Sequence, residues 1–488
     1  MRTLACLIVC WCVPSVVGAE EAKRPNVLFI AVDDLRPALG CMGDPHAKTP
    51  NLDALAARGT VFDRAYCQQA VCSPSRSSLL TGRRPDTTRV YDLVTHFRKA
   101  LPDVVTLPQH FKNHGYHVQG VGKIYHGGYN DAPSWSVPWE GTKGRNFGPE
   151  GLKRLAALKE KAKAAGEDVS RVRGLPYEAP DVADETLNDG WTANRAIEIL
   201  KERKGKKEPF FLAIGFLKPH LPFVAPKKYW DRYDASKLPV AESANPPKGA
   251  PSYAPQLGGE LRAYDGIPKK GPIDRDTARK LVHGYYAATS FMDAQLGRVL
   301  DALKAEGLAD NTIVIVWGDH GWHLGDHGIW CKHTNYEKAT RAALLIHRPG
   351  QKAAGKRTQA LVEFVDIYPT LAEVAGLPAP KGAEGHSFAP LLDDPARPWK
   401  RGAISQYPRG GGKDIGPLMG YALRTTRYRY VEWRKRGDGT VVARELYDHD
   451  TDPNESTNLA NDPAHKERIA QLAAQLAEGW KGNLPPKK

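Results

Sequence analysis

The stretch Cys72-Ser73-Pro74-Ser75-Arg76 places a potential nucleophile and a cation four residues apart. Pro74 suits the first turn of a helix and Gly82 its end, so we expect a helix with Cys72 just before its N-terminus. Free N–H groups and the helix dipole favour negative charge there. An isolated cysteine is usually a small buried residue, but Arg76, one turn further on, could reach back towards it. The stretch predicts a site that holds an anionic group over a reactive side chain.

Three carboxylates follow two apolar runs of the chain. Asp33 and Asp34 end the first run, and Asp319 follows the run Thr312–Trp317. A single aspartate could merely cap a helix. Three of them brought together would repel one another unless a cation lay between them. Because oxygen ligands suit hard ions, the pattern predicts a Ca²⁺ or Mg²⁺ site.

A second set of residues could move protons or supply positive charge. His126, His220 and Lys332 are candidates for proton transfer near neutral pH. Arg76 and Lys123 would add fixed positive charge where negative charge develops in a transition state. A divalent ion would also polarise the oxygens of an anionic substrate. These residue types together predict a site that binds an anionic group and transfers protons near it.

Short apolar runs and amphipathic stretches predict the elements that position these residues. The runs predict buried parallel strands at Asn26–Val32, Tyr116–Val121, Phe210–Phe216 and Thr312–Trp317. Helices are expected between them, at Asn51–Arg58, Trp191–Glu202 and Leu281–Lys304. The alternation predicts an α/β fold with a mostly parallel sheet. Each strand leads directly into polar residues, and ligands bind beyond the carboxyl ends of such strands, so we expect one shared pocket.

The pattern changes near residue 395. Alternating stretches at Gly420–Thr425, Arg427–Trp433 and Glu445–Tyr447, followed by a helix from about Ala464 to Trp480, predict a smaller α+β unit with an antiparallel sheet. We therefore expect a catalytic domain over residues 20–395 and a C-terminal subdomain over 396–488. Residues 235–273 are rich in Pro and Gly and predict an irregular segment that rims the pocket.

The composition and the N-terminal residues limit the classes of function that the protein could have. The 488 residues carry a formal charge of +14 with a pI near 9.3, which fits either action on polyanions or a generally basic surface. No nucleic-acid-binding motif is present in the sequence. Residues 1–19 resemble a secretory signal, and no later run is apolar enough to span a membrane, so we expect an exported protein; a lipid anchor at Cys10 or Cys12 is the alternative. Four cysteines remain beyond the signal, too few for a disulfide scaffold.

The string C-x-P-S-R followed by Thr81-Gly82-Arg83 resembles the signature of the type I sulfatases. Residues 32–37, 68–72, 81–89, 218–220 and 319–332 resemble in particular the iduronate-2-sulfatase branch of that family. The resemblance implies an alkaline phosphatase-like fold with a large, mostly parallel sheet flanked by helices. It also implies that a maturation enzyme, either formylglycine-generating or of another kind, oxidises Cys72 to 3-oxoalanine (formylglycine), whose hydrate attacks sulfur.

The same resemblance assigns roles residue by residue. It implies one Ca²⁺ bound by Asp33, Asp34, Asp319, His320 and residue 72. It implies contact of Lys123 and His126 with the modified residue, and a substrate contact for each member of the set Lys123, His220, Trp322 and Lys332. The expected substrate is a sulfated saccharide carrying a 2-O-sulfate on iduronate or a related sugar. Two alternatives stay open: a phosphatase or phosphonate esterase of the wider alkaline phosphatase superfamily, and a non-catalytic sulfoglycan-binding protein.

Overall fold

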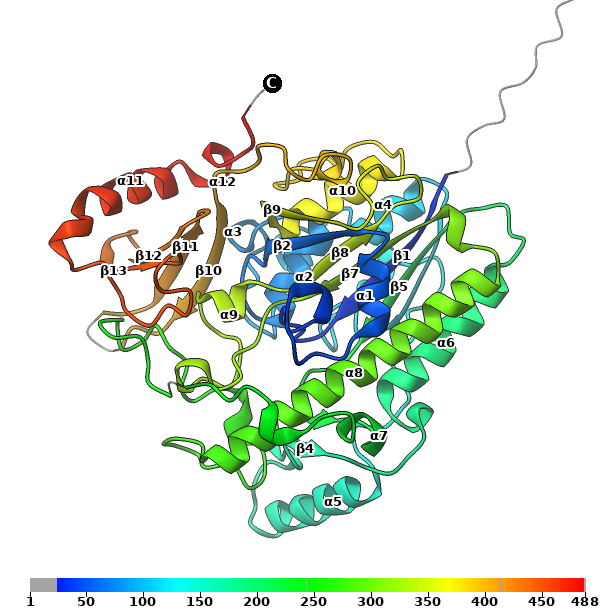
Figure 1. Ribbon diagram of the computed structural model, residues 1–488, viewed down its shortest axis with the longest axis horizontal. Helices are drawn as coiled ribbons and strands as arrows, with labels where there is room; N and C mark the ends of the chain where they lie inside the picture. Colours follow the sequence, from blue (N-terminus) through cyan, green and yellow to red (C-terminus); the bar gives the residue numbers. More distant parts are fainter. Residues whose placement is uncertain (1–23, 243, 413–414, 487–488) are drawn as a thin grey trace, which may run out of the picture.

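A seven-stranded sheet forms the centre of the larger part of the molecule, in the order β3-β5-β1-β7-β8-β2-β9 (Figure 1). β8 runs antiparallel to its neighbours β7 and β2, whereas the pairs β3–β5, β5–β1, β1–β7 and β2–β9 are parallel. The prediction of a mostly parallel α/β sheet is thus confirmed. The seven strands are β1 (Asn26–Val32), β2 (Thr60–Tyr66), β3 (His117–Gly122), β5 (Phe210–Phe216), β7 (Thr312–Gly318), β8 (Leu344–His347) and β9 (Lys356–Glu363).

The computed structural model describes residues 24–242, 244–412 and 415–486. The predicted signal at residues 1–19 lies outside them and stays a prediction. Across the described residues, no helix is both long and apolar enough to cross a membrane. Cys41, Cys67, Cys72 and Cys331 are free thiols, so the one internal disulfide that the sequence allowed does not form between them.

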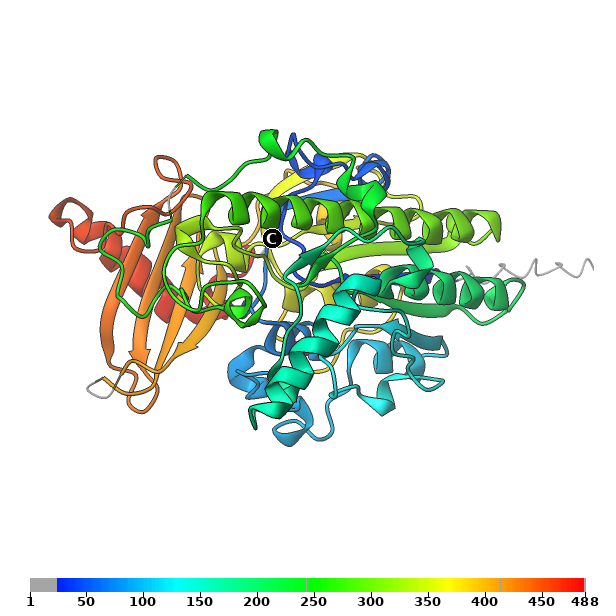
Figure 2. The same cartoon turned by 90° about the horizontal axis from the view of Figure 1, so that it is seen from below.

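Helices cover both faces of the sheet. Because side chains alternate along a strand, a buried strand such as β1 contributes to the core on each face. Val27, Phe29 and Ala31 point to one face, where they share a core with side chains of α2, α4 and α10. Leu28 and Ile30 point to the other face and pack with α1, α6 and α8. Figure 2 shows the long helices α8 and α6 lying side by side. The covering helices are α1 (Pro50–Ala56), α2 (Cys72–Thr81), α4 (Leu107–Asn113), α6 (Asn188–Arg203), α8 (Arg275–Ala305) and α10 (Ile367–Val374).

The C-terminal part contains a four-stranded antiparallel sheet in chain order, drawn in orange in Figure 1. One face of this sheet buries Leu423, Tyr430 and Leu446 against α11, and the other face packs towards the main domain through Trp433 and Tyr447. The predicted α+β unit is confirmed, while the boundary at 395/396 remains a prediction. The elements are β10 (Ala403–Arg409), β11 (Leu418–Arg424), β12 (Tyr428–Lys435), β13 (Val441–Asp448), α11 (Lys466–Ala477) and α12 (Gly479–Gly482).

The predicted irregular segment at 235–273 contains only 3₁₀ turns within its described residues, at Ala235–Lys237 and Glu260–Ala263. It is nevertheless anchored, because Leu261 and Tyr264 are buried in the same core as Trp322. The segment therefore has a fixed position beside the strand ends. The remaining α-helices and strands are α3 (Pro85–Thr88), α5 (Pro149–Ala164), α7 (Lys227–Trp230), α9 (Glu337–Thr340), β4 (Tyr177–Glu178) and β6 (Phe223–Val224).

Candidate active site

Four neighbouring parallel strands, β3, β5, β1 and β7, end at one edge of the sheet. The backbone continues their pairing by one residue: the N–H of Asp33 donates to the Phe216 carbonyl at 3.1 Å, and that of Asp319 donates to Val32 at 3.2 Å. The N–H of Lys123 donates to Gly215 at 3.0 Å. The predicted convergence of these loops on one place is therefore seen directly in the structure.

Two glycines allow β3 and β5 to meet closely at this edge. Gly122 has φ 75°, in the left-handed region, and a Cβ on it would lie 2.2 Å from the Gly215 carbonyl. A Cβ on Gly215 would lie 2.2 Å from the Lys123 carbonyl. Side chains at either position would push Lys123 away from the neighbouring strand.

Helix α2 begins at Cys72, one residue earlier than expected, and Val71 is its N-cap. The Cys72 side chain is 2% exposed, with Sγ 3.4 Å from Asp33 Oδ1 and 3.3 Å from His320 Nε2. Burial, followed by the charge of Asp33, raises the pKa of this thiol well above its usual value. A reactive cysteine needs a lowered pKa, so the unmodified thiol at this position is a poor nucleophile.

Arg76 is fully buried one turn into α2. Its Nε donates to Asp319 Oδ2 at 2.8 Å and its Nη2 to Asp33 Oδ1 at 3.2 Å. Its Nη1 donates to the carbonyls of Lys123 and Ile124. These bonds fix the two aspartates and the end of β3. The expected role of Arg76, to add positive charge where negative charge develops in the transition state, stays a prediction.

Asp33, Asp34 and Asp319 each offer an oxygen within 4.8 Å of the others, and all three are completely buried. His320 Nδ1 donates to the Gly321 carbonyl at 2.9 Å, so its Nε2 lone pair faces Asp34 and Asp319, each at 3.5 Å. Burial raises the pKa of Asp34 to about 7, although the Lys332 ammonium opposes that shift. Carboxylate oxygens and the imidazole Nε2 converge at one place, and this set of donor atoms suits a hard divalent cation such as Ca²⁺.

Two lysines surround this group of acceptors. Lys123 Nζ forms an ion pair with Asp33, and Lys332 Nζ lies 3.1 Å from Asp34 Oδ1. Although burial raises the pKa of Asp33, the charges of Lys123, His220 and Arg76 hold it well below its ordinary value. Asp33 is therefore ionised throughout the neutral range.

His220 and Lys332, both predicted to bind substrate, meet a third residue that the sequence did not single out. Glu260 lies 2.7 Å from Lys332 Nζ through Oε2 and 3.3 Å from His220 Nε2 through Oε1. Burial lowers the pKa of His220, and Glu260 opposes that shift. Glu260 lies in the irregular segment 235–273, where no periodicity or motif marks one acid among its neighbours. Only its position in the folded chain identifies it.

His126 and Trp322 lie differently from what was expected. His126 Nδ1 is buried without a hydrogen-bond partner in the described part of the chain, and burial, then Lys123, lowers its pKa to about 4. The structure places it beside Lys123 but records no bond to Cys72. Trp322 was expected to contact substrate, yet it is fully buried, with Lys332 Nζ 4.8 Å from its ring centroid. That expectation is corrected, because the buried ring of Trp322 packs against the Lys332 ammonium instead.

A cavity of about 450 Å³ opens over this centre. Asp33, Lys123, Lys218 and His220 line it, and Arg173 adds a cation at its wall. Lys218 Nζ donates to the carbonyls of His220 and Pro222, so it shapes the loop after β5. The cavity has the size of a small-molecule site and a strongly polar floor.

Comparison with known proteins places this geometry in a family. The family described as Sulfatase matches residues 25–377, and the one described as N-sulphoglucosamine sulphohydrolase, C-terminal, matches residues 325–481. Iduronate 2-sulfatase of Mus musculus is 36% identical, with 92% of this chain and 93% of that protein covered.

Solved structures agree on the fold. The phosphonate monoester hydrolase from Silicibacter pomeroyi superposes with a TM-score of 0.73 at 25% identity, covering 95% of this chain and 96% of that one. A protein solved in complex with its substrate D-glucosamine-2-N,6-O-disulfate superposes with a TM-score of 0.74 at 21% identity, covering 96% and 100%. The second likeness bears on the fold alone, which is the alkaline phosphatase-like fold predicted from the sequence.

Proposed function

We propose that this chain, which belongs to the sulfatase family, hydrolyses a 2-O-sulfate ester on iduronate or a related sugar of a sulfated glycan. The observation that carries the mechanism is the setting of Cys72. Its thiol is buried against Asp33 and His320 with a raised pKa, so the residue is well placed for attack but poorly suited to it as a thiol. Oxidation to 3-oxoalanine resolves that conflict.

The two groups that the protein has to acquire fit the residues present. Asp33, Asp34, Asp319 and His320 would hold Ca²⁺, which would supply a Lewis acid for the sulfate oxygens, and residue 72, once oxidised to formylglycine and hydrated, would offer the attacking hydroxyl. The net reaction consumes one water and releases an alcohol and inorganic sulfate.

The chain's own residues bind the ester and move the protons. Lys123 and Lys332 lie on opposite sides of the aspartates and bind sulfate oxygens through their ammonium groups. His220 Nδ1 donates to the Leu221 carbonyl at 2.6 Å, which leaves Nε2 to face the leaving alcohol. His126 has a pKa of about 4, so it is neutral near pH 7 and accepts a proton. Arg76 keeps Asp33 and Asp319 in place.

The choice of sugar is supported by the mouse relative, whose name specifies iduronate 2-sulfate chemistry. The positive charge of the chain and Arg173 in the cavity wall suit a substrate that carries a carboxylate as well as a sulfate. Export through the signal at residues 1–19 would bring the enzyme to extracellular or periplasmic glycans. A sulfatase-maturating enzyme is the partner that the mechanism requires.

The test is sulfate release from defined 2-O-sulfated disaccharides by protein co-produced with a maturation enzyme. We expect turnover by the native chain and loss of at least a thousandfold in Cys72→Ala. A peptide mass spanning residue 72 should show an aldehyde in place of the thiol. Full activity in protein whose residue 72 remains a thiol would refute the mechanism.

Phosphate or phosphonate ester hydrolysis is a second candidate, favoured by the likeness to the phosphonate monoester hydrolase. Matched sulfate, phosphate and phosphonate esters of one alcohol separate the two. We expect the sulfate ester to have the highest kcat/KM. The Glu260 carboxylate lies beside Lys332 and would repel a phosphate dianion more strongly than a sulfate monoanion. An unmodified thiol at residue 72 together with no turnover of any ester, in protein co-produced with a maturation enzyme, would favour the third possibility, a non-catalytic sulfoglycan-binding protein.

A further inference from the structure

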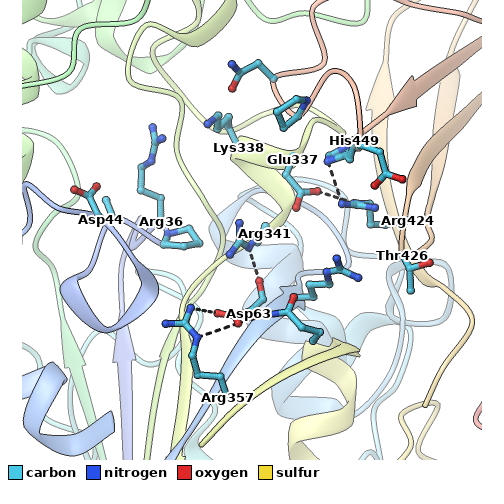
Figure 3. A pocket seen from close by; sticks show the side chains of 17 residues that line it. Arg36, Asp44, Asp63, Glu337, Lys338, Arg341, Arg357, Arg424, Thr426 and His449 are labelled. Atoms are coloured by element: carbon cyan, nitrogen blue, oxygen red, sulfur yellow. Dashed lines mark hydrogen bonds and ion pairs between the residues drawn. The ribbon is translucent and has the colours of Figure 1, made fainter. Parts of the chain in front are cut away.

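A second cavity, of about 520 Å³, lies between the β2–β9 edge of the large sheet and the C-terminal subdomain (Figure 3). Its walls come from the loop after β1, from β2 and β9, from α9 and from the segment after β13. A neighbouring cavity of about 370 Å³ shares Arg36, Lys338 and Asn454 with it. We call the two together the basic groove. Among the described residues, none lines both the basic groove and the catalytic cavity.

The acids of the larger cavity are already engaged. Asp63 is paired with Arg357, and Glu337 with Arg424 and Arg429. The other two acids are also occupied: Asp44 accepts from the Tyr286 hydroxyl at 2.6 Å, and Asp450 pairs with Arg427 at 3.3 Å. In the smaller cavity, Asp326 pairs with Arg36 at 3.1 Å, and Glu242 has no side-chain partner among the described residues. Apart from Glu242, the carboxylates of the groove therefore leave little negative charge for the remaining cations.

Three cations of the groove keep unused donors. Arg64 has no hydrogen-bond or ion-pair partner in the described ranges of the chain. Arg341 uses only Nε, which donates to the Asp63 carbonyl at 2.6 Å. Lys338 Nζ lies 3.9 Å from Asp326, too far for a hydrogen bond. Figure 3 shows Arg36, Lys338 and Arg341 around the same open space.

The local electrostatics agree with a surplus of positive charge. Burial, followed by the charge of Arg36, lowers the pKa of Lys338, although Asp326 opposes that shift. An anion placed between Lys338, Arg341 and Arg36 would remove that penalty. Neutral hydrogen-bonding side chains, Gln359, Thr426 and Asn454, complete the lining and suit hydroxyl groups of a sugar.

We propose that the basic groove is a second binding site for a sulfated oligosaccharide segment, separate from the catalytic cavity. The proposal rests on the proposed function for its substrate class. Several cations spread along two joined cavities match several sulfates along a glycan, whereas a single small anion would meet only one or two of them. The combined size of the cavities also exceeds the needs of one sulfate group.

One residue connects the groove to the catalytic centre. Arg36 Nη1 donates to the Trp322 carbonyl at 3.1 Å, while Lys332 lies over the ring of the same tryptophan. A glycan long enough to reach from the groove to Lys332 would have a raised effective concentration at the catalytic centre. The benefit should apply to long substrates and be absent for disaccharides.

The test uses the double variant Arg64→Gln/Lys338→Gln, which removes two cations without breaking the buried ion pairs. The control is Lys201→Gln/Lys207→Gln, which removes the same charge from two exposed lysines near the opposite edge of the sheet. Neither ammonium group has a side-chain partner in the described part of the chain. Binding of a dye-labelled, heparin-derived octasaccharide is measured by fluorescence anisotropy in a Cys72→Ala background. An unsulfated octasaccharide of hyaluronan tests whether sulfate is needed.

We expect the groove variant to weaken octasaccharide binding about tenfold. Its kcat/KM for the octasaccharide should fall in parallel, while disaccharide turnover stays within about twofold of the native value. Native affinity in the groove variant, an equal loss in the control variant, or equal binding of hyaluronan would overturn the proposal. Failure of the proposed function is distinct from these outcomes, because it would appear as absent turnover of both substrates while the binding comparison remains measurable.

Discussion

The Glu260 carboxylate lies 2.7 Å from the Lys332 ammonium and also 3.3 Å from His220 Nε2. The side chain thus places an internal anion on two of the groups that we assign to the sulfate ester. Glu260 comes from the segment 235–273, which has no strand or helix other than 3₁₀ turns in its described residues. A loop side chain is therefore positioned, together with the residues at the strand ends, to set the charge that the substrate meets.

Glu260→Gln should strengthen anion binding, because it removes the carboxylate that competes for Lys332 and His220. We expect the inhibition constant of inorganic phosphate to fall by about tenfold and that of inorganic sulfate by less, since the phosphate dianion is repelled more strongly. Inhibition of disaccharide turnover measures both constants. The control is Glu373→Gln on the exposed face of α10. Weaker binding of both anions in Glu260→Gln would contradict this role.

Arg76→Lys should keep the charge but lose the fork that holds Asp33 and Asp319. We expect kcat to fall by at least about a hundredfold, and the free energy of unfolding to drop by about 3 kcal/mol, because buried carboxylates lose donors. Arg84→Lys is the matched control, since Arg84 is also buried and binds Glu363 through two nitrogens at 2.8 and 2.9 Å, away from the active site. That variant should be destabilised yet keep its activity per folded molecule. Equal activity loss in both variants would argue against a specific role for Arg76.

Ca²⁺ should stabilise the native chain independently of catalysis. At a concentration one hundred times its Kd, the ion should add about 2.7 kcal/mol to the free energy of unfolding. Thermal denaturation with and without a chelator measures this, with NaCl at equal ionic strength as the reference. Asp319→Asn should abolish the response, and Asp394→Asn, which alters an exposed carboxylate, should preserve it. An unchanged response in Asp319→Asn would remove that residue from the metal site.

Acid should destabilise the fold through buried neutral histidines. Burial lowers the pKa of His323 to about 3, and that of His126 to about 4, from an ordinary value of 6.5. Between these limits the unfolded chain binds more protons than the native one, so stability is fully present above pH 6.5 and falls as the pH drops. His323→Gln should reduce the slope by up to about 1.4 kcal/mol per pH unit in urea unfolding between pH 4 and 6. His465→Gln is the control, and identical slopes in the native chain and His323→Gln would rule the explanation out.

Strongly apolar strands were predictable from sequence, and strands with mixed character were not. The limits of β1 and β5 agree with the prediction, because both strands are buried on two faces and contain almost only apolar residues. β2 was missed because Asp63 and Arg64 interrupt its apolar pattern, and Arg357, the partner of Asp63, lies in a distant part of the chain. β8 has four residues, too few for a periodic signal.

The residues of the site also fall into a predictable and an unpredictable group. The residues at the strand ends were identified because the parallel topology brings them together whatever their side chains do. The orientation of Arg76 and Trp322 was not predictable, since each depends on which partners the folded chain offers. Glu260 was inaccessible to sequence reasoning for the same reason.

The deep position of Cys72 bears on how such an enzyme has to be made. All ten residues of α2 are buried, and their backbone is committed to the helix. Under the proposed function, a modifying enzyme would have to reach Cys72 before this helix is packed. We therefore expect that protein refolded from unmodified chains regains the fold but has no sulfatase activity.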